Sequence, residues 1–397
     1  MTFDEKLQAV QKSLREQNIE GWLLYDFRRS NSLAQIFLEI PTDTLLTRRL
    51  FYWIPQQGTP IKILSSLEAH VLNHLPGEQW TYKNWQELEK LLFSIEHKKG
   101  HIAMEYSPSN ALPVVSKVDA GMVEWIQKGG GQVVSSANLL QRYTAVWSEE
   151  QVQSHLAAAD VLNEIVDHTW AFITQAITSK TKLNEYQVQQ FMLNEMQKQG
   201  CVTEHAPICA VNVHSSNPHY EPHQETASLV ERGDWILLDL WCKQKHPHAV
   251  YADITRVGVA ALEPTPQQQI IFQIVKKAQE IATQFVRDRY EKSLPIQAWE
   301  VDQVCRDYIN QEGYGEFFIH RTGHNIGEEL HGSGANLDNF ETHDFRELLP
   351  GTCFSIEPGI YLPQQFGVRL EYDVYLDYAG HLLVTGGIQK EIACLKI

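Results

Sequence analysis

The chain has 397 residues, of which 43% are hydrophobic and 10% aromatic, and its formal net charge at pH 7 is −16. This length predicts two or three domains, and the apolar fraction excludes an intrinsically disordered chain. No stretch approaches the ~20 apolar residues that cross a bilayer, and the negative charge opposes a nucleic-acid backbone, so we expect neither a membrane nor a nucleic-acid partner.

The start of the chain lacks the cationic and apolar segments of a secretory signal, which favours a cytoplasmic location. Six cysteines are scattered along the chain without a CxxC pair. This spacing is typical of buried thiols in a reducing compartment rather than of a disulfide framework or a structural zinc site.

Residues 1–146 alternate between helical and strand patterns, which predicts a small α/β domain. A helix is expected near residues 4–17, and strands are expected at 21–25, 50–55 and 61–65. The glycine-rich segment 128–132 predicts a turn, because no Lys-Ser/Thr pair follows it to form a phosphate loop.

Residues 147–397 predict a second domain that begins with a capping box. Ser148 is the expected N-cap, and Gln151 lies three residues later, at the start of a long stretch with helical apolar spacing. Further helices are expected at 183–199, 266–290 and 298–311, between strand-rich blocks at 203–260 and 351–396. Each block contains a pair of expected strands with two acidic side chains that point inward, which indicates an internal pseudo-twofold symmetry.

The first strand-rich block contains two acids on neighbouring strand patterns. Asp239 shares its strand face with Trp241, and Asp253 repeats the pattern further along. The polar segment 243–248 predicts the turn of an antiparallel hairpin, which would direct both acids to one interior point. For either acid alone, a buried Asp that caps a turn or pairs with an arginine is an alternative. Two acids that face each other, however, need a cation or a shared proton.

Two later segments each contribute one more candidate. His324 lies in the Gly/His-rich segment 320–331, where glycine permits close backbone approach and imidazole is a common ligand of divalent metals. Alone, this segment would fit a surface loop better than a metal site, because the chain has 17 histidines. Glu357 ends a strand pattern directly before Pro-Gly, and the alternative there is a simple strand-terminating turn.

The last candidate lies in a strand pattern at residues 367–374. This pattern places Arg369, Glu371 and Asp373 on one face, although alone it would also fit a solvated charged edge, and Asp373 is expected to be structural. The candidate set is then Asp239, Asp253, His324, Glu357 and Glu371. Four carboxylates and one imidazole in one interior repel one another unless cations lie between them, so together they predict a two-metal site.

The order and spacing of these residues resemble the pita-bread metallopeptidases, specifically the Xaa-Pro aminopeptidase and prolidase branch. The resemblance rests on the segments 238–239, 253–256, 320–331, 356–361 and 368–371. It covers about residues 150–397, whereas residues 1–146 resemble the family's N-terminal domain only in general pattern. It implies an α/β (α+β) chain with a small N-terminal α/β domain at 1–146. Residues 147–397 would form the pita-bread catalytic domain, a curved antiparallel sheet covered by helices.

The resemblance also implies a role for each candidate ligand. Asp239 would chelate one metal ion, His324 and Glu357 would bind the other, and Asp253 and Glu371 would bridge the pair. This oxygen-rich set with one imidazole suits Mn²⁺, our first choice, while Co²⁺, Zn²⁺ and Fe²⁺ stay open.

The implied activity is that of a dinuclear metallopeptidase acting on a proline-containing peptide. It would hydrolyse the Xaa-Pro bond of dipeptides or short peptides through a metal-bridging hydroxide. Glu357 would take a proton from the bridging water and pass it toward the proline nitrogen. Whether the enzyme is a dipeptidase or an aminopeptidase stays open.

Further residues match family positions near the substrate or the ligands. The resemblance implies substrate or pocket roles for His219, His331 and His320. Arg369 would brace Glu371 or contact substrate, with bracing favoured. Tyr361 and Thr255 belong to the same matching segments and are expected beside the substrate or the ligands.

Two other functions are alternatives to the peptidase activity. A creatinase-like amidinohydrolase uses the same fold without metal, and a non-catalytic pita-bread module binds peptides or proteins; the five intact ligands argue against both. The family further leads us to expect a homodimer. This chain departs from the family pattern in a longer Asp239–Asp253 interval and in Trp241, which stands where a small residue is frequent and would narrow the pocket.

Overall fold

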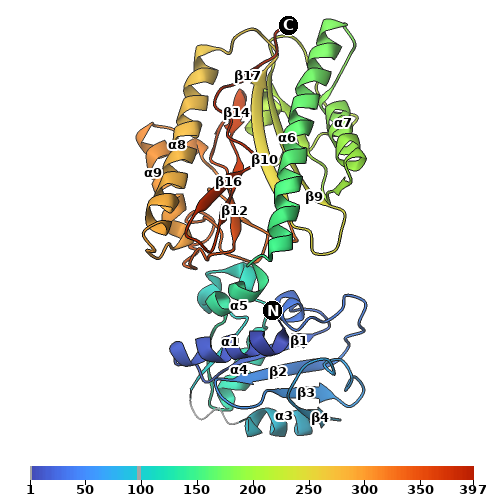
Figure 1. The fold of residues 1–397 in the computed structure, drawn as a ribbon, viewed down its shortest axis with the longest axis vertical. Helices are drawn as coiled ribbons and strands as arrows, with labels where there is room; N and C mark the ends of the chain where they lie inside the picture. The colour runs from blue at the N-terminus through green and yellow to red at the C-terminus, as the bar shows by residue number, and fades with distance from the viewer. Residues whose placement is uncertain (1, 96–99) are drawn as a thin grey trace. The chain divides into compact units, whose positions relative to one another are not determined.

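The computed structural model describes residues 2–95 and 100–397. Contacts divide the chain into two compact units, Met1–Thr144 and Ala145–Ile397 (Figure 1). Among the described residues, no helix combines the length and the apolar character needed to cross a bilayer.

The first unit contains a six-stranded mixed sheet in the order β4-β3-β2-β1-β5-β6. Its strands are β1 (Gly21–Phe27), β2 (Arg49–Pro55), β3 (Ile61–Ser65), β4 (Glu78–Tyr82), β5 (His101–Met104) and β6 (Gln132–Ser135). Its helices are α1 (Phe3–Glu16), α2 (Ser32–Phe37), α3 (Trp85–Ser94), α4 (Ala120–Lys128) and α5 (Ala137–Thr144), with short 3₁₀ helices η1 (Pro108–Asn110) and η2 (Pro113–Val115). The helix and the three strands expected here are all present.

Apolar side chains of this sheet pack against the helices that cover it. Leu23 and Ile63 from the sheet share one buried cluster with Leu88 of α3 and Ile126 of α4. The glycine-rich segment after α4 is a turn, as expected, and Gly130 adopts a φ of 99°, a conformation that favours glycine.

The second unit begins with the predicted capping box. The Ser148 side chain accepts a hydrogen bond from the Gln151 N–H, and the Gln151 side chain accepts one from the Ser148 N–H. The helices are α6 (Glu149–Thr178), α7 (Glu185–Lys198), α8 (Pro266–Tyr290) and α9 (Ala298–Gln311), with η3 (Asn212–Ser216) and η4 (Gly315–Phe317). α7 begins after the expected position 183 because Asn184 is its N-cap.

The strands of the second unit form several ladders. They are β7 (Cys201–Val202), β8 (Ile208–Val211), β9 (Trp235–Gln244), β10 (Ala252–Val259), β11 (Asn325–Ile326), β12 (Cys353–Ile356), β13 (Gly359–Leu362), β14 (Phe366–Arg369), β15 (Tyr372–Leu376), β16 (Leu382–Thr385) and β17 (Ala393–Cys394). One five-stranded sheet contains β17-β10-β9-β7 with β8, and a four-stranded sheet has the order β11-β12-β15-β16. The two sheets meet at β10 and β15, where the Asp253 N–H donates to Asp373 Oδ2 at 2.9 Å.

One expected strand is divided in the structure. The pattern at 367–374 predicted one continuous strand, but β14 ends at Arg369 and β15 begins at Tyr372. Between them, the Leu370 N–H donates a hydrogen bond to Pro358 O, and the Glu371 N–H donates one to Thr255 O. The backbone therefore changes its partner strand at these two residues. Arg369 and Glu371 therefore do not share one strand face.

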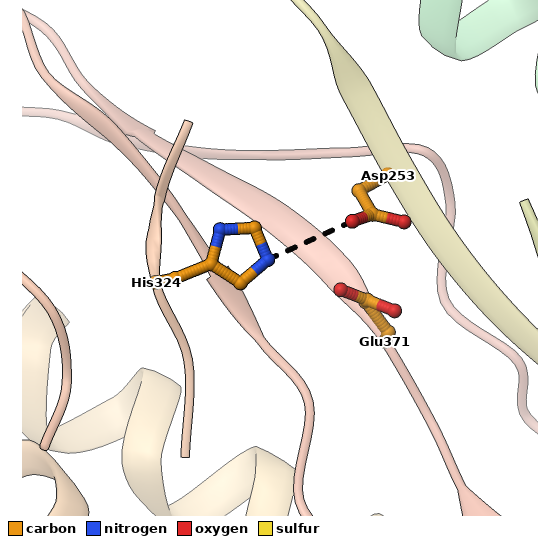
Figure 2. A group of neighbouring side chains, drawn as sticks. All are labelled: Asp253, His324 and Glu371. Atoms are coloured by element: carbon orange, nitrogen blue, oxygen red, sulfur yellow. Dashed lines mark ion pairs between the residues drawn. The ribbon is translucent and has the colours of Figure 1, made fainter. Parts of the chain in front are cut away.

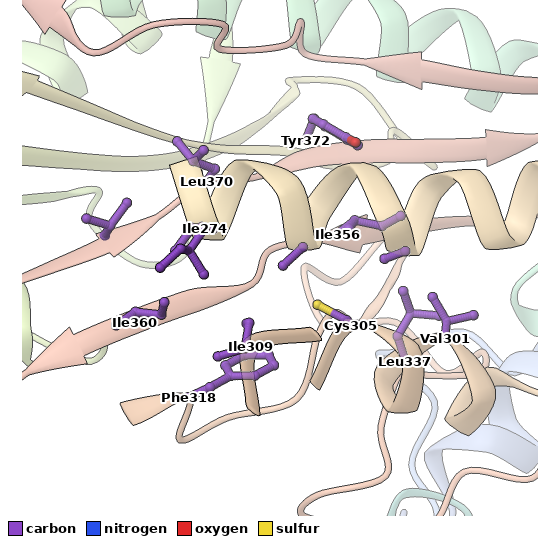
Figure 3. Packing of buried hydrophobic residues seen from close by; sticks show 14 of the residues in the cluster. Ile274, Val301, Cys305, Ile309, Phe318, Leu337, Ile356, Ile360, Leu370 and Tyr372 are labelled. Atoms are coloured by element: carbon purple, nitrogen blue, oxygen red, sulfur yellow. The ribbon is translucent and has the colours of Figure 1, made fainter. Parts of the chain in front are cut away.

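Helices cover the two strand systems of the second unit (Figure 1). α6 packs on β9 and β10, where Leu162 and Ile165 share a buried cluster with Leu238 and Ile254. On the other side, α8 and α9 pack against β12 to β15, as the cluster around Ile356 and its neighbours shows (Figure 3). These two cores fix the strands whose ends carry the predicted ligands.

Candidate metal centre

A cavity of about 480 Å³ in the second unit is lined by the predicted ligands. They are Asp239, Asp253, His324, Glu357 and Glu371. They come from β9, β10, the residue before β11, the residue after β12 and the turn between β14 and β15. The fold thus gathers into one cavity side chains from distant parts of the chain, and the cavity has the size of a small-molecule site.

Asp253, His324 and Glu371 form the centre of this group (Figure 2). Each offers one ligand atom, and these atoms lie within 4.8 Å of one another. His324 Nε2 is 3.7 Å from Asp253 Oδ2 and 3.5 Å from Glu357 Oε1. The Nδ1–H donates to Asn325 O at 3.2 Å, which leaves the Nε2 lone pair directed at the carboxylates.

Asp239 is joined to this centre by a threonine. Thr255 pairs with Asp239 in the β9–β10 register, and its hydroxyl lies 3.1 Å from Asp239 Oδ1 and 2.6 Å from Glu371 Oε2. The hydroxyl therefore holds two of the predicted ligands in a fixed relation, which is the kind of support that metal ligands need.

Arg369 braces a different carboxylate from the one favoured by the sequence analysis. Its guanidinium pairs with Asp239, not with Glu371, and it also donates to Thr255 Oγ1 at 3.1 Å and to Tyr361 OH at 3.0 Å. Arg369 reaches Glu371 only through Thr255, whose hydroxyl accepts from Arg369 and lies 2.6 Å from Glu371 Oε2.

The buried carboxylates carry the strongest electrostatic signal in the site. Burial raises the pKa of Asp253 and Glu371 well above its ordinary range, and the neighbouring carboxylates raise it further. Burial also raises the pKa of Asp239, which the charge of Arg369 opposes, and raises the pKa of Glu357 to about 7. Asp253 and Glu371 would therefore hold protons rather than negative charge unless cations approached them.

The residues present fit divalent metal ions. Asp253 Oδ1 and Glu371 Oε1 are buried and have no hydrogen-bond partner among the described residues. An unpaired buried carboxylate oxygen raises the free energy of the folded state. These atoms therefore need a partner that the described residues do not supply. Four carboxylates with one imidazole suit ions such as Mn²⁺, Co²⁺, Fe²⁺ or Zn²⁺.

The three predicted histidines line the same cavity. His219 and His331 lie on its exposed rim, and His320 is half-buried in its wall. The His320 Nδ1–H donates to Arg321 O at 2.7 Å, so its Nε2 accepts from Tyr361 OH at 2.8 Å. Burial lowers the pKa of His320 to about 3, so its ring is neutral at pH 7.

A buried polar group behind Asp253 was missed by sequence reasoning. Asp373 accepts the Asp253 N–H, and His155 Nε2 lies 3.9 Å from the same Asp373 oxygen and 2.6 Å from Thr385 Oγ1. Only Asp373 stood near a recognised motif. His155 lies on α6, within a stretch whose apolar spacing gave no signal of a polar partner.

Two further cavity residues had no predicted role. Neither His205 nor Arg321 was singled out by the sequence analysis, yet both line the cavity. Arg321 is the neighbour of His320, so its position in the Gly/His-rich segment was the only available signal. His205 precedes β8 and had none.

Comparisons with known proteins agree with this geometry. The model of metallopeptidase family M24 matches residues 153–377, more than half of the chain. The uncharacterized peptidase YqhT of Bacillus subtilis is 29% identical over 255 residues, which cover 64% of this chain and 66% of the relative. The Xaa-Pro dipeptidase of Lactobacillus helveticus is 36% identical over 164 residues, 41% of this chain and 40% of the relative. The matched segments thus span less than two thirds of these curated relatives.

A solved structure extends the likeness to the whole chain. The recombinant prolidase from Thermococcus sibiricus covers 99% of both chains with a TM-score of 0.66 and 22% sequence identity. At 22% identity, the match supports a shared fold and does not support a shared activity. It confirms the expected α/β architecture, with a pita-bread domain and a smaller N-terminal domain.

Proposed function

The chain belongs to metallopeptidase family M24, and from this premise we propose that it is a dinuclear peptidase that hydrolyses the Xaa-Pro bond of dipeptides or short peptides. The observation that carries the proposal is the buried group of Asp253, His324 and Glu371, with unpartnered carboxylate oxygens facing one cavity. The substrate class is supported by the Lactobacillus helveticus relative, which is named an Xaa-Pro dipeptidase.

Five side chains would hold the metal. Asp253 and Glu371 are central in the group and would be shared between two ions, while Asp239 would complete one site and His324 with Glu357 the other. When bound, two divalent ions, for which we propose Mn²⁺, supply Lewis acidity and lower the pKa of water toward neutrality.

Glu357 is the residue that we propose as the proton carrier. Its carboxyl lines the cavity, where Oε1 lies 3.5 Å from His324 Nε2 and accepts a hydrogen bond from Ser355 Oγ at 3.1 Å. A carboxylate held in this way beside the predicted ligands can take a proton from one reacting group and pass it to another, as general acid–base catalysis requires. In our proposal, Glu357 takes a proton from the attacking water and delivers it to the proline nitrogen.

The remaining polar residues would position substrate and ligands. We propose that His219 and His331, on the rim of the cavity, hydrogen-bond the substrate. His320 accepts from Tyr361 OH, and Tyr361 in turn accepts from Arg369, the partner of Asp239. This chain of contacts orients Asp239, so His320 acts as a positioning residue.

The test compares Xaa-Pro with Xaa-Pro-Yaa substrates on Mn²⁺-loaded protein. We expect the wild type to hydrolyse the Xaa-Pro bond. The rate of this hydrolysis should fall at least 100-fold in the Asp253→Asn variant, because the isosteric amide removes one negative charge from the centre of the site. Cleavage of Xaa-Pro alone identifies a dipeptidase, and cleavage of both identifies an aminopeptidase. Full activity in the Asn variant would refute the metal mechanism.

We further propose that the enzyme acts as a homodimer in the cytoplasm. All six cysteines are free thiols, as suits a reducing compartment. Light scattering on the purified protein should then return twice the chain mass of 45.5 kDa, and a mass equal to that of one chain would exclude the dimer.

A further inference from the structure

One wall of the cavity is apolar, in contrast to the acids beneath it. It consists of Trp241, Leu330, Ile208 and Ala206. None of these side chains can bind a metal ion or carry a proton, so the metal site leaves this wall without a role. Apolar walls of binding cavities contact apolar parts of a ligand, while a few polar groups fix its orientation.

The position of Trp241 is set by the β9–β10 hairpin. Trp241 follows Asp239 by two residues, so its side chain leaves the strand on the same face, and it lies opposite Asp253 in the register. Ile208 of β8 pairs with Asp239 in the neighbouring register and continues the apolar surface. The indole therefore stands directly beside two of the predicted ligands.

Packing holds the indole in place. Trp241 and Leu330 are half-buried and pack against one buried cluster that includes Val250, Tyr251 and Ile326. One side of the indole is thus supported by the core, while the other faces the cavity. A large flat side chain fixed in this way offers a preformed contact surface.

We propose that Trp241, supported by Leu330, determines specificity by contacting the side chain of the residue before proline, and that this contact favours apolar side chains over glycine there. The inference rests on the proposed function. Glu357 would deliver a proton to the proline nitrogen, so the proline lies toward Glu357. Glu357 follows β12 and Trp241 lies on β9, and both line the cavity, so a substrate with its proline nitrogen at Glu357 would place the preceding residue against Trp241.

The test measures kcat/KM for Gly-Pro, Ala-Pro, Leu-Pro and Phe-Pro on Mn²⁺-loaded, full-length protein. We expect the wild type to prefer Leu-Pro and Phe-Pro over Gly-Pro by at least tenfold. Trp241→Ala should lower kcat/KM for Leu-Pro and Phe-Pro by at least tenfold and change Gly-Pro by less than about threefold. Trp241→Phe should keep the wild-type ranking, because it preserves an aromatic surface.

Two controls separate specificity from folding. Trp85→Ala removes an exposed tryptophan that does not line the cavity and should leave all four values unchanged. As a second control, the four substrates share proline and differ only in the first residue, so a change in their ranking in Trp241→Ala reports contact with that first residue.

The possible failures are distinct from one another. An equal loss on all four substrates in Trp241→Ala, or a gain on Phe-Pro, would overturn the specificity inference and leave the proposed peptidase intact. A wild type that hydrolyses neither these four dipeptides nor an Xaa-Pro-Yaa tripeptide would overturn both proposals.

Discussion

His155 is a fully buried imidazole that supports the site without lining it. Its Nδ1 lies 2.7 Å from Tyr251 O and its Nε2 lies 2.6 Å from Thr385 Oγ1. The Asp373 carboxylate and the Cys353 thiol face the same ring at 3.9 Å and 4.0 Å. Since Asp373 also binds the Asp253 N–H, this cluster connects α6 to the backbone of a predicted ligand.

His155 should make stability depend on pH. Burial lowers its pKa to about 4, below the ordinary 6.5, so the unfolded chain binds more protons between these values. Its contribution is therefore complete above pH 6.5 and is lost as the pH falls toward 4, by about 3 kcal/mol in total. In His155→Gln, the free energy of unfolding should depend less steeply on pH over this range.

Urea unfolding of both proteins at several pH values between 7 and 4 checks this prediction. Only the difference between the two curves is used, so carboxyl groups that do not contact His155 cancel, and the difference reports His155 together with its neighbour Asp373. Parallel curves would show that His155 does not titrate as the structure indicates.

At the scale of single residues, the sequence predicted which side chains gather but not how they pair. The ligands stood in recognisable motifs, and all of them line one cavity. The partner of Arg369 was not predictable, because it depends on where the chain leaves β14. Contacts such as His155 with Asp373 join residues far apart in the sequence, and no local pattern encodes them.

Among the structural elements, the segment before β11 depends on close backbone contact. A Cβ added to Gly323 would lie 2.0 Å from Ser355 O, whereas a Cβ on Gly327 would meet nothing nearer than 3.6 Å. The neighbouring Ser355 N–H donates to His324 O at 2.9 Å, so this close approach sets the position of a predicted ligand. Neither glycine has a positive φ, so the two positions differ in the room that they leave for a Cβ atom.

The substitution Gly323→Ala should therefore push the His324 segment away from β12. We expect the free energy of unfolding to fall by about 1–3 kcal/mol, the usual cost of overpacking, and the Mn²⁺ affinity to fall at least tenfold. Gly327→Ala is the matched control and should change neither strongly. Calorimetric titration with Mn²⁺ and urea unfolding measure both quantities, and equal effects of the two variants would contradict the argument.

Elements with strong local signals were predicted closely, and those set by tertiary pairing were not. α8 and α9 have the predicted bounds, and the capping box of Ser148 is formed. The division at residues 370–371 was missed, because each side of it has strand character and only the change of partner strand separates them. The strands of the second unit are also divided among several sheets. This division depends on which distant strands pair with one another, and no local pattern encodes it.

On the scale of the whole molecule, the charge of −16 complicates any test of metal binding. An acidic surface attracts divalent cations without a specific site. Asp253→Asn separates the two effects, because it changes the net charge by one unit and leaves the surface unaltered. A difference between this variant and the wild type therefore reports the buried site.

Mn²⁺ should stabilise the wild type and not the Asn variant. A ligand that binds only the folded state at 100 times its Kd adds about 2.7 kcal/mol to stability. All cavity residues lie in the unit Ala145–Ile397, so we expect slower hydrogen exchange in peptides from β10, β12 and β15 of that unit. Mass spectrometry resolves these peptides separately. Equal slowing in Asp253→Asn would assign the effect to the acidic surface, and no slowing in the wild type would exclude the metal site.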